Sequence, residues 1–178
     1  MRRLALATAL ALAPAPLLAQ QAAAPLPLGS AELRQASVEA LQATLYDLIA
    51  LRAAAHQMHW NVIGIEFYQL HEVYETLYAS LDGFIDDTGA RIRALGAPVD
   101  GRSVAVAENS PVTPPPVEEI GGEESARLLL ADYARVADRL RERIGATGDD
   151  LVTQDHLVAV TAAVEKDLWM LRAHVGGS

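Results

Sequence analysis

The chain lacks cysteine and is poor in lysine and in aromatic residues. Of its 178 residues none is cysteine, one is lysine (Lys166), and 5% are aromatic. The absence of cysteine excludes a disulfide framework, so the thiols give no indication of the redox compartment. The formal net charge is −9. This charge argues against a surface that binds nucleic acid through its phosphates, which requires a basic face or tail.

The residues that are abundant indicate a helical protein with a substantial core. Half of the chain (51%) is hydrophobic, largely alanine and leucine, which are strong helix formers. The length is enough for one domain after processing of the N-terminus.

The N-terminus resembles an export signal. Arg2 and Arg3 form a short basic region, residues 4–19 are mostly apolar, and small residues follow. We expect residues 1–24 to be a signal peptide, cleaved after Ala19 or Ala24, and residues 25–178 to be the mature domain. An uncleaved anchor or a disordered apolar tail is the alternative. Cleavage would remove two positive charges and change the net charge from −9 to −11. The sequence therefore predicts a periplasmic protein.

Four long helices are predicted from the spacing of apolar residues. They cover residues 31 or 37 to 60, 66–95, 123–144 and 151–174, and Asp150 or Thr153 is expected to cap the last one. Residues 99–122 contain the run Ser-Pro-Val-Thr-Pro-Pro-Pro, which cannot form one regular helix, although 104–107 could form a short helical turn. Connections that are short, long and short describe an all-α four-helix bundle with one crossover between helices 2 and 3. This is the ferritin-like topology.

A stripe of potential metal ligands lies on the second predicted helix. At about 100° per residue, Glu75, Asp82 and Asp86 fall at roughly 40°, 20° and 60° from His71. Burying such a stripe on an otherwise apolar helix is costly unless something pairs with it. A bound metal ion is the simplest explanation.

Two longer segments resemble a known family. HWNVIGIEFYQLHEVYETLYASLDGFID is similar to the signature region of the Dps mini-ferritins, and DLVTQDHLVAVTAAVEKDLWMLRAHV is similar to their last helix. The resemblance extends over residues 38–175. It implies a shell of twelve subunits that oxidises iron(II), preferably with peroxide, and stores the ferric product inside, which protects the cell against oxidative stress.

The resemblance also implies a metal site between two subunits related by a two-fold axis. One subunit would supply His59, His71 and Glu75, and its partner would supply Asp86. An antiparallel pair of second helices would allow this approach. Imidazole and carboxylate ligands suit iron(II) and also zinc.

One residue departs from the family pattern. Ala90 occupies the place of a glutamate that binds iron in the family, so the first iron should bind less tightly. Asp82 could compensate, whereas Asp87 points away from the stripe at about 160° from His71. The alternative to a ferroxidase is therefore a non-catalytic metal-binding or structural cage with an impaired site.

The sequence does not decide the roles of two aromatic side chains near the predicted ligands. Trp60 could quench radicals or could pack the two-fold interface, and His56 could extend the metal site or could be an ordinary interface residue.

DNA binding is not expected. The predicted mature N-terminus QQAAAPLPLGSAELRQ contains no lysine, and the C-terminus ends in Gly-Gly-Ser. Members of the family that condense DNA commonly do so through a lysine-rich tail, so protection of the cell envelope is the more natural role.

Overall fold

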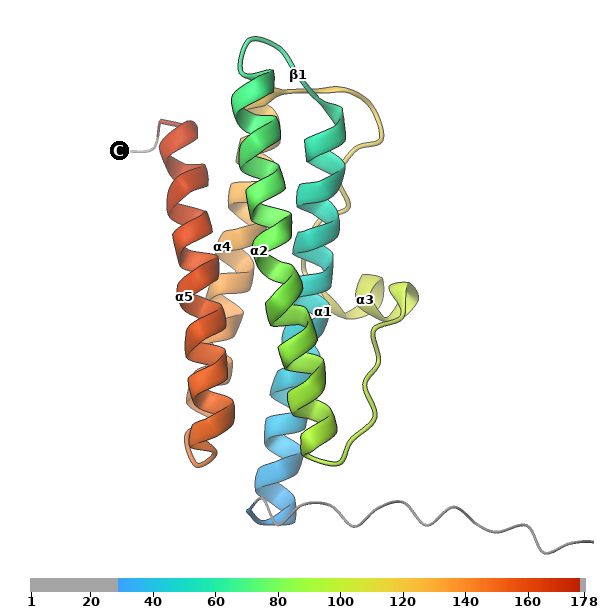
Figure 1. The fold of residues 1–178 in the computed structure, drawn as a ribbon, viewed down its shortest axis with the longest axis vertical. Coiled ribbons are helices and arrows are strands. Elements are labelled where there is room, and N and C mark those ends of the chain that lie inside the picture. The colour runs from blue at the N-terminus through green and yellow to red at the C-terminus, as the bar shows by residue number, and fades with distance from the viewer. Residues whose placement is uncertain (1–28, 177–178) are drawn as a thin grey trace, which may run out of the picture.

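The computed structural model describes residues 29–176 of the chain. The predicted signal peptide lies outside these residues. Five helices follow one another, four long and one short: α1 (Ala31–Asn61), α2 (Phe67–Ala94), α3 (Ser103–Asn109), α4 (Gly122–Ala146) and α5 (Leu151–His174). The long helices lie side by side as a bundle, with α3 beside it (Figure 1). The all-α prediction is confirmed, and every predicted long helix is present. None of the helices in the described part of the chain is both long and apolar enough to cross a membrane.

The proline-rich connection carries the chain along the whole bundle. α1 and α2 run antiparallel, and α2 ends at the lower end of the bundle in Figure 1 while α4 begins at the upper end. The crossover between helices 2 and 3 of the predicted bundle is thus the segment that contains α3. The predicted helical turn at 104–107 lies within α3.

A two-stranded parallel pairing, which the sequence did not predict, joins the end of this connection to the α1–α2 turn. β1 (Val62–Ile63) follows α1 directly, β2 (Ile120–Gly121) precedes α4, and Val62 pairs with Ile120. The pairing ties the α1–α2 turn to the N-terminus of α4. The turn itself contains Gly64 at φ = 105°, a left-handed conformation that glycine adopts at little cost.

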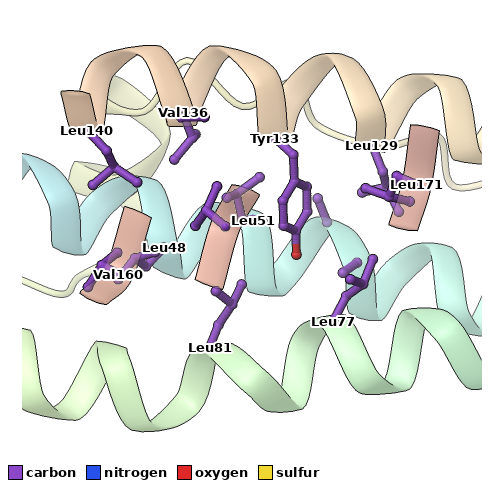
Figure 2. Close-up of a cluster of buried hydrophobic side chains, with 14 of the residues drawn as sticks. Leu48, Leu51, Leu77, Leu81, Leu129, Tyr133, Val136, Leu140, Val160 and Leu171 are labelled. Carbon is purple, nitrogen blue, oxygen red and sulfur yellow. The ribbon is translucent and has the colours of Figure 1, made fainter. Parts of the chain in front are cut away.

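The core lies between the four long helices. Leucines of α1 and α2 point at leucines, valines and a tyrosine of α4 and α5 (Figure 2). Leu48, Leu51, Leu81 and Leu140 are completely buried. Buried residues recur every three or four positions, as at Leu48 and Leu51 of α1 and at Leu77 and Leu81 of α2, which places them on one face of each helix. Burial of such a side chain stabilises the fold by roughly 1.5–3 kcal/mol.

Asp47 and Asp150 each connect two of the long helices through ion pairs. Asp47 of α1 is completely buried and accepts hydrogen bonds from Arg139 at 3.0 Å and from Arg143 at 2.7 Å, both on α4. At the lower end of the bundle, Asp150 caps α5 by accepting from the Thr153 amide, as one of the two predicted caps. It also pairs with Arg91 of α2 at 3.0 Å.

Candidate metal centre

The α1–α2 turn brings two histidines face to face. His59 lies in the last turn of α1 and His71 in the second turn of α2. Because the helices are antiparallel and joined by a short turn, the two residues meet across the hairpin. Their rings are stacked, with centroids 3.7 Å apart and planes at 20°.

Each histidine is held by the backbone of the other. His59 Nδ1 lies 2.8 Å from the carbonyl oxygen of His71, and His71 Nδ1 lies 2.8 Å from the carbonyl oxygen of His59. A carbonyl oxygen can only accept, so each Nδ1 carries a proton and donates it. In the neutral imidazole, Nε2 then keeps its lone pair. This is the tautomer that binds a metal through Nε2, and it is commonly fixed by such a bond. The donor set of this pair therefore fits a first-row transition metal.

Aromatic side chains border the histidine pair. His59 is 8% exposed. The ring of Tyr78 meets His59 edge-on at 5.4 Å, and the ring of Phe67 lies 5.2 Å from His71. These rings limit the access of water, which strengthens any charge interaction at the pair.

The predicted carboxylate ligands lie on the surface of α2. Glu75, one turn after His71, and Asp86, further along, are exposed. Asp86 lines an open hollow of about 670 Å³ together with Ala90. Nowhere in residues 29–176 do three or more histidine, aspartate or glutamate side chains come close enough to hold one metal ion. The single chain thus brings His59 and His71 together but leaves the ligand set incomplete.

Asp82, which was predicted to compensate for the glutamate missing at position 90, is engaged in an ion pair. It forms an ion pair with Arg52 of α1, and both side chains are partly exposed. Arg52 was not among the site residues predicted from the sequence. It lies seven residues before His59, a spacing that returns to the same helix face and could have indicated it.

Trp60 and His56 form a stack beside the pair. Trp60 is 62% exposed, and its ring lies 4.1 Å from that of His56. The other neighbour of His56 is Tyr78, at 4.3 Å. Burial and then the nearby Arg52 guanidinium lower the pKa of His56, which favours its neutral form. The radical-quenching role of Trp60 stays a prediction.

The fold and this site define a class of protein, and comparisons with known proteins identify the family. A model of the ferritin-like domain matches residues 38–177, so the chain belongs to the ferritin-like family. Within that family it is a Dps mini-ferritin, as its relatives show. "DNA protection during starvation protein 2" of Deinococcus radiodurans is 33% identical over 149 residues. The match covers 83% of this chain and 62% of that protein, so the chain spans less than two thirds of that relative.

Other relatives match over more of their length. The "DNA protection during starvation protein" of Brevibacillus brevis is 32% identical over 70% of this chain and 85% of its own. The crystal structure of Dps92 from Deinococcus radiodurans superposes with a TM-score of 0.80 at 32% identity, covering 83% of this chain and 90% of that one. The prediction of a Dps mini-ferritin is therefore confirmed.

Proposed function

We propose that the protein oxidises iron(II) at sites formed between two copies of the chain and stores the ferric product in a hollow assembly of twelve. Membership of the Dps family supports iron as the substrate. The observation that carries the proposal is the reciprocal hydrogen bonding of His59 and His71, which presents two Nε2 lone pairs without a third ligand from residues 29–176 of the same chain.

A second copy is the natural source of the missing carboxylate. The exposed face of α2 carries one continuous stripe of polar and small side chains: Glu75, Ala79, Asp82, Asp86 and Ala90. Alanines in this stripe allow a second helix to approach closely. If two α2 helices pair antiparallel, each Asp86 reaches the histidine pair of the other chain. Large exposed apolar residues near the α1–α2 turn, Trp60, Ile65 and Tyr68, also favour an assembled state.

The spacing of the histidines suits two metal ions. The two stacked rings, with centroids 3.7 Å apart, are separate ligands, and two-metal sites hold their ions roughly 3.5–4 Å apart. Each ferrous ion gives one electron to peroxide. The peroxide takes both electrons and two protons and leaves as two water molecules, and the O–O bond breaks. Glu75 and Asp86 supply negative charge that stabilises the ferric products.

Stopped-flow absorbance at the ferric band tests this proposal. Anaerobic wild-type protein receives iron(II) and then peroxide, beside His71→Ala and Asp86→Ala variants and an Asp138→Asn control at an exposed position of α4. We expect oxidation to be fast in the wild type and control and lost in the two site variants. Equal, slow rates in all four proteins would refute the ferroxidase proposal.

Mixing the two inactive variants tests whether the site lies between subunits. In assemblies formed at random from His71→Ala and Asp86→Ala chains, about one quarter of the sites combine an intact His71 with an intact Asp86 from the partner. We therefore expect about a quarter of the wild-type activity to return. No recovery would mean that His71 and Asp86 act within one chain.

The short side chain of Ala90 supports the second candidate function, a metal-binding cage without oxidation. Asp82, the carboxylate predicted to replace the missing one, is paired with Arg52 in the described structure. An Ala90→Glu variant distinguishes the two functions. If the wild type does not oxidise iron(II) and the Ala90→Glu variant oxidises it rapidly, the natural protein is a binder of iron or zinc and not a ferroxidase.

We further infer that the protein works in the periplasm and does not bind DNA. Eight of the eleven arginines in residues 29–176 are in ion pairs with carboxylates, so little cationic surface remains for phosphates. Cell fractionation with N-terminal sequencing tests export and the cleavage site. A gel-shift assay at low salt tests DNA binding, and a salt-sensitive shift would contradict the inference.

A further inference from the structure

A second polar group lies on the same side of the α1–α2 hairpin as the histidine pair. It consists of Arg52 and His56 of α1 and Asp82 of α2, here called the Arg52 cluster. His56 lies one turn before His59, with ring centroids 6.0 Å apart. Asp82 lies one turn after Tyr78, the residue against which His56 packs. The cluster is therefore adjacent to the proposed iron site but separate from it.

Neighbouring rings hold His56 in place, but its imidazole makes no hydrogen bond in the described part of the chain. The rings of Trp60 and Tyr78 hold its imidazole from two sides at 4.1 and 4.3 Å. The histidine hydrogen bonds within residues 29–176 are made by His59, His71 and His156. His56 thus keeps both ring nitrogens open for a ligand. An oriented neutral imidazole beside a carboxylate is a donor pair for divalent transition metals.

The ion pair with Arg52 is weak enough to be replaced. In the single chain the side chain of Arg52 is 37% exposed and that of Asp82 is 56% exposed, so water screens the pair before a second copy packs against α2. Exposed pairs of this kind change equilibria by only about a factor of 1.4 to 5. A divalent cation that also binds an imidazole competes well against such a partner.

We propose that His56 and Asp82 form a second, weaker position for a divalent transition-metal ion, and that Arg52 holds Asp82 until the metal replaces it. Two protein ligands leave most of the coordination shell to water, so the ion exchanges readily. The position then serves to load iron(II) onto His59, one helical turn away. This loading role rests on the proposed function, whereas the existence of the metal position does not.

Cobalt(II) binding under anaerobic conditions tests the proposal on the whole assembled protein. Bound metal is measured by ultrafiltration and elemental analysis, and coordination by the visible absorption of cobalt. We expect two classes of site in the wild type. His56→Gln and Asp82→Asn should each remove the weaker class and retain the tighter one, and His59→Ala should do the reverse.

The Arg52→Gln variant tests whether Arg52 competes with the metal ion for the carboxylate of Asp82. It should tighten metal binding at the weaker class by about 1.4- to fivefold, the factor that corresponds to an exposed ion pair. The matched control is Arg127→Gln, which removes the same charge from an exposed pair with Glu123 on α4 and should change nothing.

The proposal is overturned if the wild type shows one class only, if His56→Gln and Asp82→Asn both keep the weaker class, or if Arg52→Gln behaves like Arg127→Gln. A His59→Ala variant that retains both classes would instead contradict the proposed iron site and leave the second position standing.

Discussion

Asp167 is a buried carboxyl that should destabilise the fold at neutral pH. It lies on α5 and is 3% exposed. Burial raises its pKa from 3.8 to about 6, against the opposing effects of the Ser80 hydrogen bond and Lys166. Ser80 Oγ lies 3.2 Å from the carboxylate and 2.9 Å from the Leu77 carbonyl oxygen. One hydroxyl hydrogen cannot serve both acceptors. A protonated Asp167 can donate to Ser80, whose own hydrogen then goes to Leu77.

The direction of the pH effect follows from this raised pKa. Between about pH 4 and pH 6 the folded protein binds more protons at Asp167 than the unfolded chain does, so the free energy of unfolding falls as the pH rises through this window. A pKa raised by about 2 corresponds to at most about 3 kcal/mol at neutral pH. Asp167→Asn removes this penalty but introduces an amide that also needs partners. We therefore expect the variant to be about 1–3 kcal/mol more stable at pH 7 and to have no advantage near pH 4.

Urea unfolding followed by circular dichroism measures this difference. Wild type, Asp167→Asn and the exposed control Asp138→Asn are compared at several values from about pH 4 to pH 7.5, a range that spans the expected titration. Comparing the proteins at each pH cancels the titration of the other groups. A difference between wild type and Asp167→Asn that does not change with pH, or a variant that is less stable than wild type at pH 7, would refute the reasoning.

Three further substitutions test the core by the same urea assay. Asp47→Ala should cost about 3–5 kcal/mol because it leaves two α4 arginines without their buried partner; a loss below about 1 kcal/mol would show that water replaces the carboxylate. Tyr133→Phe should be neutral or stabilising by up to about 1 kcal/mol, since its buried hydroxyl has no hydrogen-bond partner in the described part of the chain; marked destabilisation would reveal a hidden partner. Gly122→Ala should cost about 1–3 kcal/mol because a methyl group there would collide with the Glu66 carboxylate and would lie 2.8 Å from Leu70; unchanged stability would mean that both side chains move aside freely.

The helices could be predicted because local signals and the apolar spacing agree. Gly64 and Pro98 lie in the turns that bound α2, and Asp150 caps α5. The structure moves the predicted helix ends by only a few residues. Local chemistry determines these points: glycine for a left-handed turn, proline after a helix end and a side-chain acceptor for free amides.

The contacts that cross the bundle could not be predicted in the same way. Asp47 lies in a helix among polar and apolar residues, and nothing in its neighbours distinguishes a buried acid from a surface one. Its partners Arg139 and Arg143 are more than ninety residues away. The pairing of Val62 with Ile120 likewise depends on how the crossover returns. The Asp47 ion pairs and the strand pairing can be recognised only once the three-dimensional arrangement of the helices is known.

The histidine pair was predictable as a set of residues but not as a geometry. The motif placed His59 and His71 near a metal, and the structure brings them together. That each ring donates to the carbonyl of the other depends on the shape of the five-residue turn between their helices. The ion pair of Asp82 with Arg52 depends on the register between α1 and α2, which a helical wheel of α2 alone does not include.

The distribution of ligands between the fold and the assembly has a physical reason. A neutral imidazole can be buried in one chain at little cost when a carbonyl accepts its proton, as at His59. A carboxylate buried without a counter-ion would be far more expensive. Glu75 and Asp86 remain in water on the surface of α2 until, in the proposed centre, a second chain and a metal ion arrive together. The neutral ligands are thus organised by folding and the charged ligands by assembly, so at this centre the monomer does not bear the cost of an unpaired buried charge.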